Sequence, residues 1–275
     1  VVLNTIMIYP TGAIQLGPAA VPFWGAGLGV AGAAIATGIS TAIVAAAMLF
    51  VLLRRSVLRL QAPGSYRLTR TCLQNVFILG FPAALERITL CTAQIVMTGV
   101  VAGLGTVSMA ANTLAVTAES ICYLPSYGIG AAATTLVGQS VGADRRDLAR
   151  HFAWLTTGLG VLLQSAMAVV LYTQAPLLIG IFSQVPEVIE LGSAVLRIVA
   201  ISEPLFAVSI VATGALRGAG DSRGPFLINL ISMWGIRVTL VLFFTRSLGL
   251  KGIWIAMTVE ILARGSIFLA ALSRG

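Results

Sequence analysis

VTAESICYLPSYGIG (116–130) places a glutamate, a proline and two glycines inside a long apolar run. A helix in lipid must satisfy its backbone polar groups internally, so a charge or a helix breaker inside it is costly. Proline removes one backbone donor and bends a helix, which frees a carbonyl one turn back. Whether Glu119 and Pro125 form a working site or only shape a bend depends on the rest of the chain.

The composition indicates an integral membrane protein. Of the 275 residues, 58% are hydrophobic and only 9% are charged, whereas about a quarter of a soluble domain is charged. The formal net charge of +8 does not favour nucleic acid as a partner, because the arginines lie in short loops between apolar runs. The single histidine, His151, and three widely spaced cysteines argue against a catalytic triad, a metal site and a disulfide framework. We therefore expect neither an enzyme nor a bound cofactor.

The apolar runs predict an all-α, polytopic helix bundle in the lipid bilayer. Seven full spans are expected, at about 26–53, 76–101, 108–137, 153–175, 188–215, 225–245 and 252–272. The opening VVLNTIMIY (1–9) predicts the tail of an eighth, partial span.

Basic residues are concentrated in every second loop, which predicts how the protein is oriented in the membrane. One set of loops and the C-terminus carry eleven arginines: Arg54, Arg55, Arg59, Arg67, Arg70, Arg145, Arg146, Arg150, Arg217, Arg223 and Arg274. The other set carries only Arg246 and Lys251. The arginine-rich side, including the C-terminus, is therefore expected to face the cytoplasm.

Two short stretches suggest an internal repeat. LGVAGAAIA (28–36) and LGLKGIWIA (248–256) share Leu-Gly, a second Gly and Ile-Ala at matching positions. A period of about 220 residues would belong to a longer protein built from two similar halves. Because the chain also starts with Val1, within a span, we expect it to be part of a longer polypeptide.

The predicted spans contain eight ionisable side chains, and each needs a partner of opposite charge or a water-filled cavity. They are Glu86, Arg87, Glu119, Arg197, Glu203, Arg237, Glu260 and Arg264. Glu260 and Arg264 are spaced i,i+4 and are expected to form a supporting ion pair. Glu86 and Arg87 are neighbours about 100° apart around the helix, so they cannot share one face.

Two of the glutamates have a helix breaker beside them. Glu203 precedes Pro204, and Glu119 is followed by Pro125 and Gly128, so we expect helix breaks at these three residues. Freed carbonyls and a carboxylate together make ion and substrate sites in transporters. The alternative is a bend required for packing, with the glutamate paired to Arg237 or Arg197. One carboxylate can hold a proton, a metal cation or a cationic substrate, but not all at once, which is what ion coupling requires.

Four motifs resemble a known family. AANTLAVTAESICYLPSYGIGAAATTLVGQSVGADRRDLA (110–149) and GALRGAGDSRGPFLINLISMWGIRV (214–238) are similar to signatures of the multidrug and toxic compound extrusion (MATE) family. GFPAALE (80–86) and GIWIAMTVEILAR (252–264) resemble the start of its second half and its last helix.

The resemblance implies a two-lobed transporter of twelve helices that exports organic cations against an inward Na⁺ or H⁺ gradient. On this basis residues 1–53 would end the first lobe with a partial helix and the last helix of that lobe. Residues 54–75 would be a cytoplasmic linker between lobes, and 76–275 the second six-helix lobe. The remainder of the first lobe would be the missing partner.

The sequence thus predicts one lobe of an ion-coupled antiporter in a prokaryotic cytoplasmic (inner) membrane. We expect Glu119 and Glu203 to bind ion or substrate, followed by Glu86, with Arg237 as a charge partner. The coupling ion stays open between H⁺ and Na⁺, because no aspartate lies within a predicted span. Two alternatives are a flippase for a lipid-linked precursor, which would favour arginine-lined cavities, and a non-transporting membrane partner subunit with fully paired charges.

Overall fold

A computed structural model describes residues 2–8, 10–16, 19–54 and 69–274. The chain divides into two compact units, Val1–Leu68 and Thr69–Gly275. The division falls within the expected linker, 54–75, most of which lies outside the described residues. The assignment of the two units to two lobes of a transporter stays a prediction.

The first unit contains two helices and a hairpin. Helix α1 (Val2–Ile8) occupies the predicted partial span, and α2 (Gly29–Arg54) the first full span. Between them, β1 (Pro10–Leu16) and β2 (Ala19–Ala26) form an antiparallel pair. The sequence analysis assigned no element to residues 10–25, because the two strands are short and only partly alternating. The predicted all-α fold class is confirmed, and within the described residues this hairpin is the one departure from it.

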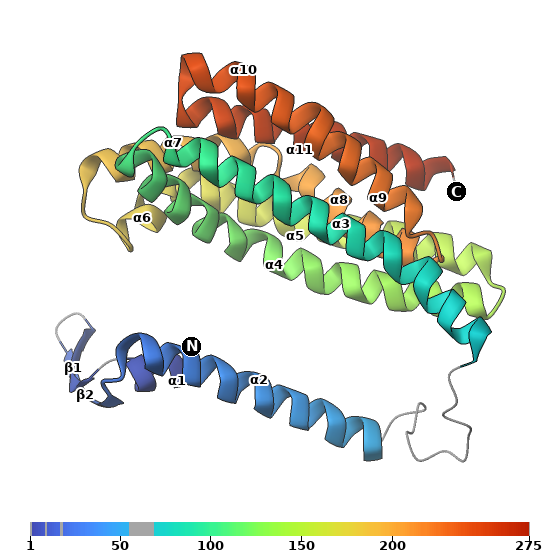
Figure 1. Ribbon diagram of the computed structural model, residues 1–275, viewed down its shortest axis with the longest axis horizontal. Coiled ribbons are helices and arrows are strands. Elements are labelled where there is room, and N and C mark those ends of the chain that lie inside the picture. The colour runs from blue at the N-terminus through green and yellow to red at the C-terminus, as the bar shows by residue number, and fades with distance from the viewer. Residues whose placement is uncertain (1, 9, 17–18, 55–68, 275) are drawn as a thin grey trace. The chain divides into compact units, whose positions relative to one another are not determined.

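The second unit is a bundle of long helices (Figure 1). Its elements, in chain order, are α3 (Arg70–Ala102), α4 (Thr106–Gly142), α5 (Arg146–Thr173), α6 (Ala175–Gly180), α7 (Pro186–Ala200), α8 (Glu203–Gly218), α9 (Arg223–Leu230), η1 (Ile231–Val238), α10 (Thr239–Leu248) and α11 (Leu250–Arg274). The segment η1 is a π-helix that joins α9 to α10 in one long span.

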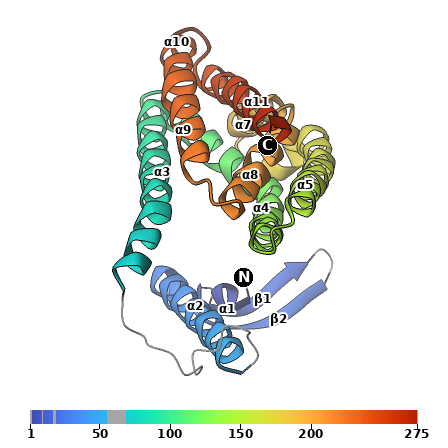
Figure 2. The same ribbon diagram turned by 90° about the vertical axis from the view of Figure 1, so that its right-hand side faces the viewer.

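Helix α8 lies at the centre of this bundle, packed against α4, α5 and α11 (Figure 2). Small residues let α4 and α8 approach closely, as is usual between membrane helices. A Cβ added to Gly214 of α8 would lie 2.3 Å from the carbonyl oxygen of Gly130 on α4. The hydroxyl of Thr134 donates to the Gly214 carbonyl at 2.8 Å across the same crossing.

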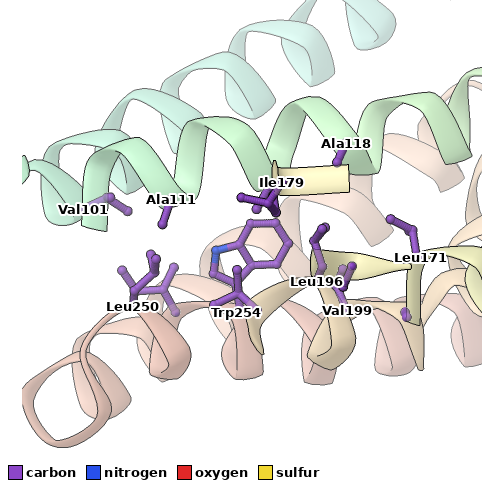
Figure 3. Packing of buried hydrophobic residues seen from close by; sticks show 14 of the residues in the cluster. Val101, Ala111, Ala118, Leu171, Ile179, Leu196, Val199, Leu250 and Trp254 are labelled. Carbon is purple, nitrogen blue, oxygen red and sulfur yellow. The ribbon is translucent and has the colours of Figure 1, made fainter. Parts of the chain in front are cut away.

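The interior contains two apolar clusters. The larger one surrounds Trp254 of α11 and includes Leu171, Ile179 and Leu196 from α5, α6 and α7 (Figure 3). The smaller one surrounds Phe268 of α11 and includes Val208 and Val211 of α8. Many outward side chains are apolar too, such as Leu162 and Phe243, which suits contact with lipid chains.

The span count differs from the prediction of seven. Within the described ranges, five helices are long and apolar enough to cross a membrane, or six if α7 and α8 count as one span bent by 59°. The predicted span at 108–137 corresponds to α4, which is long enough but is not among them. The reason is its content of Ser, Thr, Gly and Glu119, which lowers its apolarity.

Candidate functional site

Glu203 lies at the bend between two helices. Helix α7 ends at Ala200 and α8 begins at Glu203, with Pro204 in its first turn. Proline is favoured there because its missing N–H would have no intrahelical partner. The predicted break at Pro204 is therefore present, and it places a fully buried carboxylate at the N-terminus of a helix, where the helix dipole favours negative charge.

Polar side chains from two neighbouring helices reach Glu203. The Gln164 amide of α5 donates to the Glu203 carboxylate at 2.5 Å. The Ser126 hydroxyl of α4 donates in turn to the Gln164 amide oxygen. The second oxygen of Glu203, Oε1, is buried and has no hydrogen-bond partner among the described atoms. Half of this carboxylate is thus available to a proton or another cation.

Glu119 lies on α4 in the same region and is 3% exposed. No hydrogen bond or ion pair reaches its carboxylate from the part of the chain that the structure describes. The charges of Glu203 and Arg237 are close enough to act on it. A buried carboxylate without a partner is rare in structural positions.

Glu119 lines one of two cavities that lie next to each other. Its cavity has a volume of about 250 Å³, and aromatic side chains, among them Tyr123 and Trp254, form part of its wall. A second cavity of about 470 Å³ is bordered by Glu86 and Arg217. The two share five lining residues: Arg87, Leu90, Tyr127, Phe206 and Arg264. Together they form a continuous polar and aromatic face of the bundle.

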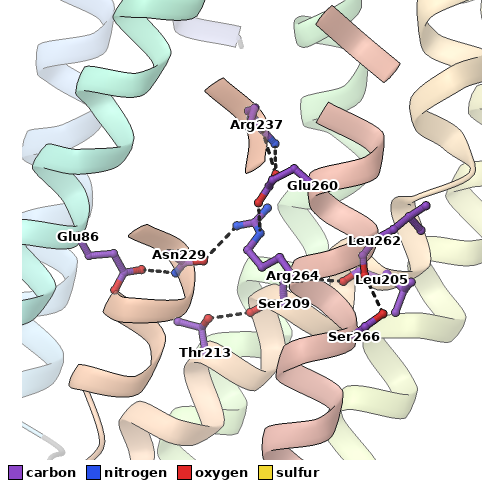
Figure 4. A network of polar contacts seen from close by, with 10 residues as sticks. All are labelled: Glu86, Leu205, Ser209, Thr213, Asn229, Arg237, Glu260, Leu262, Arg264 and Ser266. Carbon is purple, nitrogen blue, oxygen red and sulfur yellow. Dashed lines mark hydrogen bonds and ion pairs between the residues drawn. The ribbon is translucent and has the colours of Figure 1, made fainter. Parts of the chain in front are cut away.

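A chain of polar contacts runs beside these cavities (Figure 4). Glu86 of α3 forms an ion pair with Arg217 of α8 at 2.7 Å. It also accepts a hydrogen bond of 2.8 Å from the Asn229 amide of α9. The Asn229 oxygen accepts from the Arg264 guanidinium at 3.2 Å. Glu86 therefore links three helices.

The other end of this polar chain is centred on Glu260 of α11. Arg264 lies 2.9 Å from one Glu260 oxygen, so the expected i,i+4 contact is present. Arg237 of η1 approaches the other oxygen at 2.6 Å. Glu260 is fully buried and both arginine side chains are largely covered. Two guanidinium groups thus share one carboxylate inside the bundle.

Arg237 was expected as a charge partner of Glu119 and Glu203; among the described residues it forms no ion pair with either, although its charge acts on Glu119. Its ion pair is with Glu260, because η1 packs directly against α11. Arg197, the other arginine considered, lies exposed on α7, where it donates to the Tyr172 carbonyl at 3.4 Å.

The predicted breaks at Pro125 and Gly128 are wrong. Helix α4 runs from Thr106 to Gly142 with Pro125 inside it. One proline costs a single backbone hydrogen bond, and α4 packs extensively against α5 and α8, which favours a continuous helix.

Three polar residues of the site escaped the sequence analysis: Gln164, Asn229 and Arg217. Gln164 and Asn229 lie inside predicted spans, and an amide in an apolar run is a signal that could have been used. Arg217 was assigned to a loop, whereas it lies in the last turn of α8.

Comparisons with known proteins show what this architecture resembles. The family model described as MatE matches residues 82–243. The chain is 28% identical over 244 residues to the probable multidrug resistance protein NorM of Thermotoga maritima, covering 88% of this chain and 52% of that protein. It is 29% identical over 237 residues to the multidrug resistance protein NorM of Burkholderia vietnamiensis, covering 82% and 50%. The chain thus spans about half the length of the curated relatives it matches.

Solved structures agree on the fold. A crystal structure of a MATE protein in complex with MaL6 superposes with a TM-score of 0.80 at 19% identity, covering 90% of this chain and 58% of that one. The Vibrio cholerae MATE transporter VcmN in its bent form gives a TM-score of 0.76 at 20% identity, covering 90% and 56%. With the motifs of α4 and of α8–α9 inside the matched region, the chain belongs to the MatE family of multi-pass membrane transporters, which are not enzymes.

Proposed function

We propose that the chain forms the coupling lobe of an antiporter that exports small organic cations in exchange for H⁺ or Na⁺. The protein would lie in the inner membrane with its C-terminus in the cytoplasm and would work by alternating access. The coupling ion would be transported rather than held as a cofactor. The remaining lobe of the transporter would come from the same polypeptide.

The observation that carries this proposal is the state of the four buried glutamates. Glu86 and Glu260 are neutralised by arginines. Glu119 and Glu203 form no ion pair with an arginine among the described residues, and the charge of Glu203 acts on Glu119 more strongly than that of Arg237 does. Two neighbouring acids without a basic partner favour the binding of a cation, since one bound charge relieves their mutual repulsion.

This arrangement also bears on the two alternative functions. A non-transporting partner subunit would be expected to have all its intramembrane charges paired, and Glu119 is an exception. A flippase for a lipid-linked precursor would be expected to lack deep acids without a basic partner, whereas Glu119 lines the smaller cavity and Glu203 is fully buried, neither in an ion pair with a described residue. Antiport is therefore the function that the geometry supports best.

The test is transport by the protein as its gene encodes it, reconstituted in vesicles with an imposed pH or Na⁺ gradient. We expect Glu119→Gln and Glu203→Gln each to reduce gradient-driven uptake of tetraphenylphosphonium at least about tenfold, because the amide cannot exchange a cation. Glu190→Gln is the matched control, since Glu190 is exposed on α7, and it should transport normally. Uptake that survives in both variants would contradict the assignment.

A further inference from the structure

Gln164 is a buried amide that connects α5 to both α4 and α8. Its side chain is completely covered, as are those of Ser126 on α4 and Glu203 on α8. The amide nitrogen donates to Oε2 of Glu203 at 2.5 Å, and the amide oxygen accepts from the Ser126 hydroxyl. A buried amide is costly unless its polar atoms are bonded, and here each end of the amide has a partner.

The Ser126 hydroxyl determines which end of the amide faces the carboxylate. An ionised carboxylate only accepts hydrogen bonds, so the nitrogen of Gln164 must point to Glu203. Ser126 donates to the opposite end, which favours the same orientation. Oε2 of Glu203 is therefore occupied by Gln164, and Oε1, which has no partner among the described atoms, is the oxygen left for an ion.

The groups around Glu203 offer its carboxylate no basic partner. Its charge acts on three side chains of α4, namely Glu119, Cys122 and Tyr123, none of which is basic. On α11, Glu260 and Arg264 bond to each other. The charged side chains of α5 and α7 are all exposed. Among the described residues, Gln164 is thus the donor on which the ionised form of Glu203 depends.

We infer that Gln164 is a positioning residue for the ion-coupled step, which holds Glu203 as an ionised carboxylate with Oε1 as the ion-binding atom. A donor bonded to a carboxylate stabilises its charged form over its protonated form. Such a bond contributes more than one between two neutral groups. The role of Ser126 is to keep the amide in the donating orientation. The inference rests on the proposed function, because it concerns the same carboxylate.

The test measures the protonation of Glu203 directly and needs no ion gradient. Dicyclohexylcarbodiimide reacts with the protonated form of a buried carboxyl group and leaves a covalent label, which mass spectrometry assigns to a residue. The protein as its gene encodes it is purified in detergent, and the rate of labelling at Glu203 is measured at neutral and at acidic pH. Glu203→Gln supplies the blank.

Substitution of Gln164 isolates the donated hydrogen bond. Gln164→Met keeps the length of the side chain but cannot donate, so labelling of Glu203 at neutral pH should become about tenfold faster, as expected for the loss of one hydrogen bond to a charged group. The increase should vanish at acidic pH, where Glu203 is protonated in every variant. A purely structural role of Gln164 would instead change access to Glu203 and speed labelling at both pH values.

Two further variants complete the design. Ser126→Ala should speed labelling at neutral pH by only about threefold, because the amide stays but loses its orienting bond, and it tests the same contact if Gln164→Met does not fold. Thr157→Ala is the matched control, since Thr157 is buried on the same helix and its hydroxyl bonds to the Ala153 carbonyl within α5. It should leave the labelling rate unchanged.

Four results would overturn the inference. They are an unchanged rate in both Gln164→Met and Ser126→Ala, an increase that persists at acidic pH, the same increase in Thr157→Ala, or no labelling of Glu203 in the unaltered protein at any pH. A failure of the antiport proposal gives a different pattern, in which labelling depends on Gln164 while Glu203→Gln leaves gradient-driven transport intact.

Discussion

Glu260 is the carboxylate on which the charge balance of the bundle interior depends. It is fully buried between Arg237 and Arg264. Removal of one partner from a buried ion pair leaves an uncompensated charge, at a cost of about 3–5 kcal/mol. Here the loss of one carboxylate would leave two guanidinium groups facing each other, so Glu260 is expected to be more important for stability than for transport.

The expected result is a large loss of stability in Glu260→Gln. The double variant Glu260→Gln/Arg237→Gln keeps the net charge of the cluster and leaves Arg264 bonded to Asn229, so it should be more stable than the single variant. Thermal unfolding in detergent measures both. Equal unfolding temperatures for Glu260→Gln and the unaltered protein would show that the cluster does not stabilise the fold.

Sequence reasoning located the buried charges but not most of their partners. Glu260 and Arg264 could be paired because they lie one turn apart on the same helix. The contacts Glu86–Arg217 and Glu203–Gln164 join residues that are far apart in the chain, and no local pattern identifies them.

At the scale of elements, the crossing of α4 and α8 sets the spacing of the site. Glu119 and Ser126 lie on α4, and Glu203 begins α8. The two backbones approach closely at Gly130 and Gly214, where no side chain intervenes. Any residue larger than glycine at this crossing would separate the two helices.

Gly214→Ala is therefore expected to destabilise the bundle by about 1–3 kcal/mol, the usual cost of overpacking. Gly128→Ala is the matched control. Gly128 lies on α4, the partner of α8 at this crossing, and an added Cβ there meets no atom within 4 Å. The unfolding temperature should fall for the first variant and hold or rise slightly for the second. A comparable fall of the unfolding temperature in both variants would mean that the close approach of α4 and α8 at Gly214 does not determine the stability of the bundle.

The spans were largely predictable, whereas their internal shape was not. Long apolar runs placed α3, α5 and α11 to within about seven residues at each end, because lipid favours uninterrupted helices. Pro204 marked the bend before α8, yet Pro125 caused no break in α4. The π-helical turn that carries Arg237 and the hairpin β1–β2 leave no clear pattern, since packing and pairing decide them.

At the scale of the whole molecule, the unequal distribution of basic residues predicts which side faces the cytoplasm. Arg246 and Lys251 lie where α10 meets α11, and Arg274 ends α11. A helix of 25 residues rises about 1.5 Å per residue, which is enough to cross the hydrocarbon layer. The two ends of α11 should therefore lie on opposite sides of the membrane.

Two matched cysteine substitutions test this orientation. Ser247, near the end of α10, and Ser273, near the end of α11, are both exposed, and Cys72, Cys91 and Cys122 would be replaced first by serine. A membrane-impermeant maleimide added to intact cells should label Ser247→Cys and spare Ser273→Cys, because arginine-rich segments stay on the cytoplasmic side. Labelling of Ser273→Cys alone would reverse the predicted topology. Labelling of both only after the cells are broken would mean that neither position lies outside.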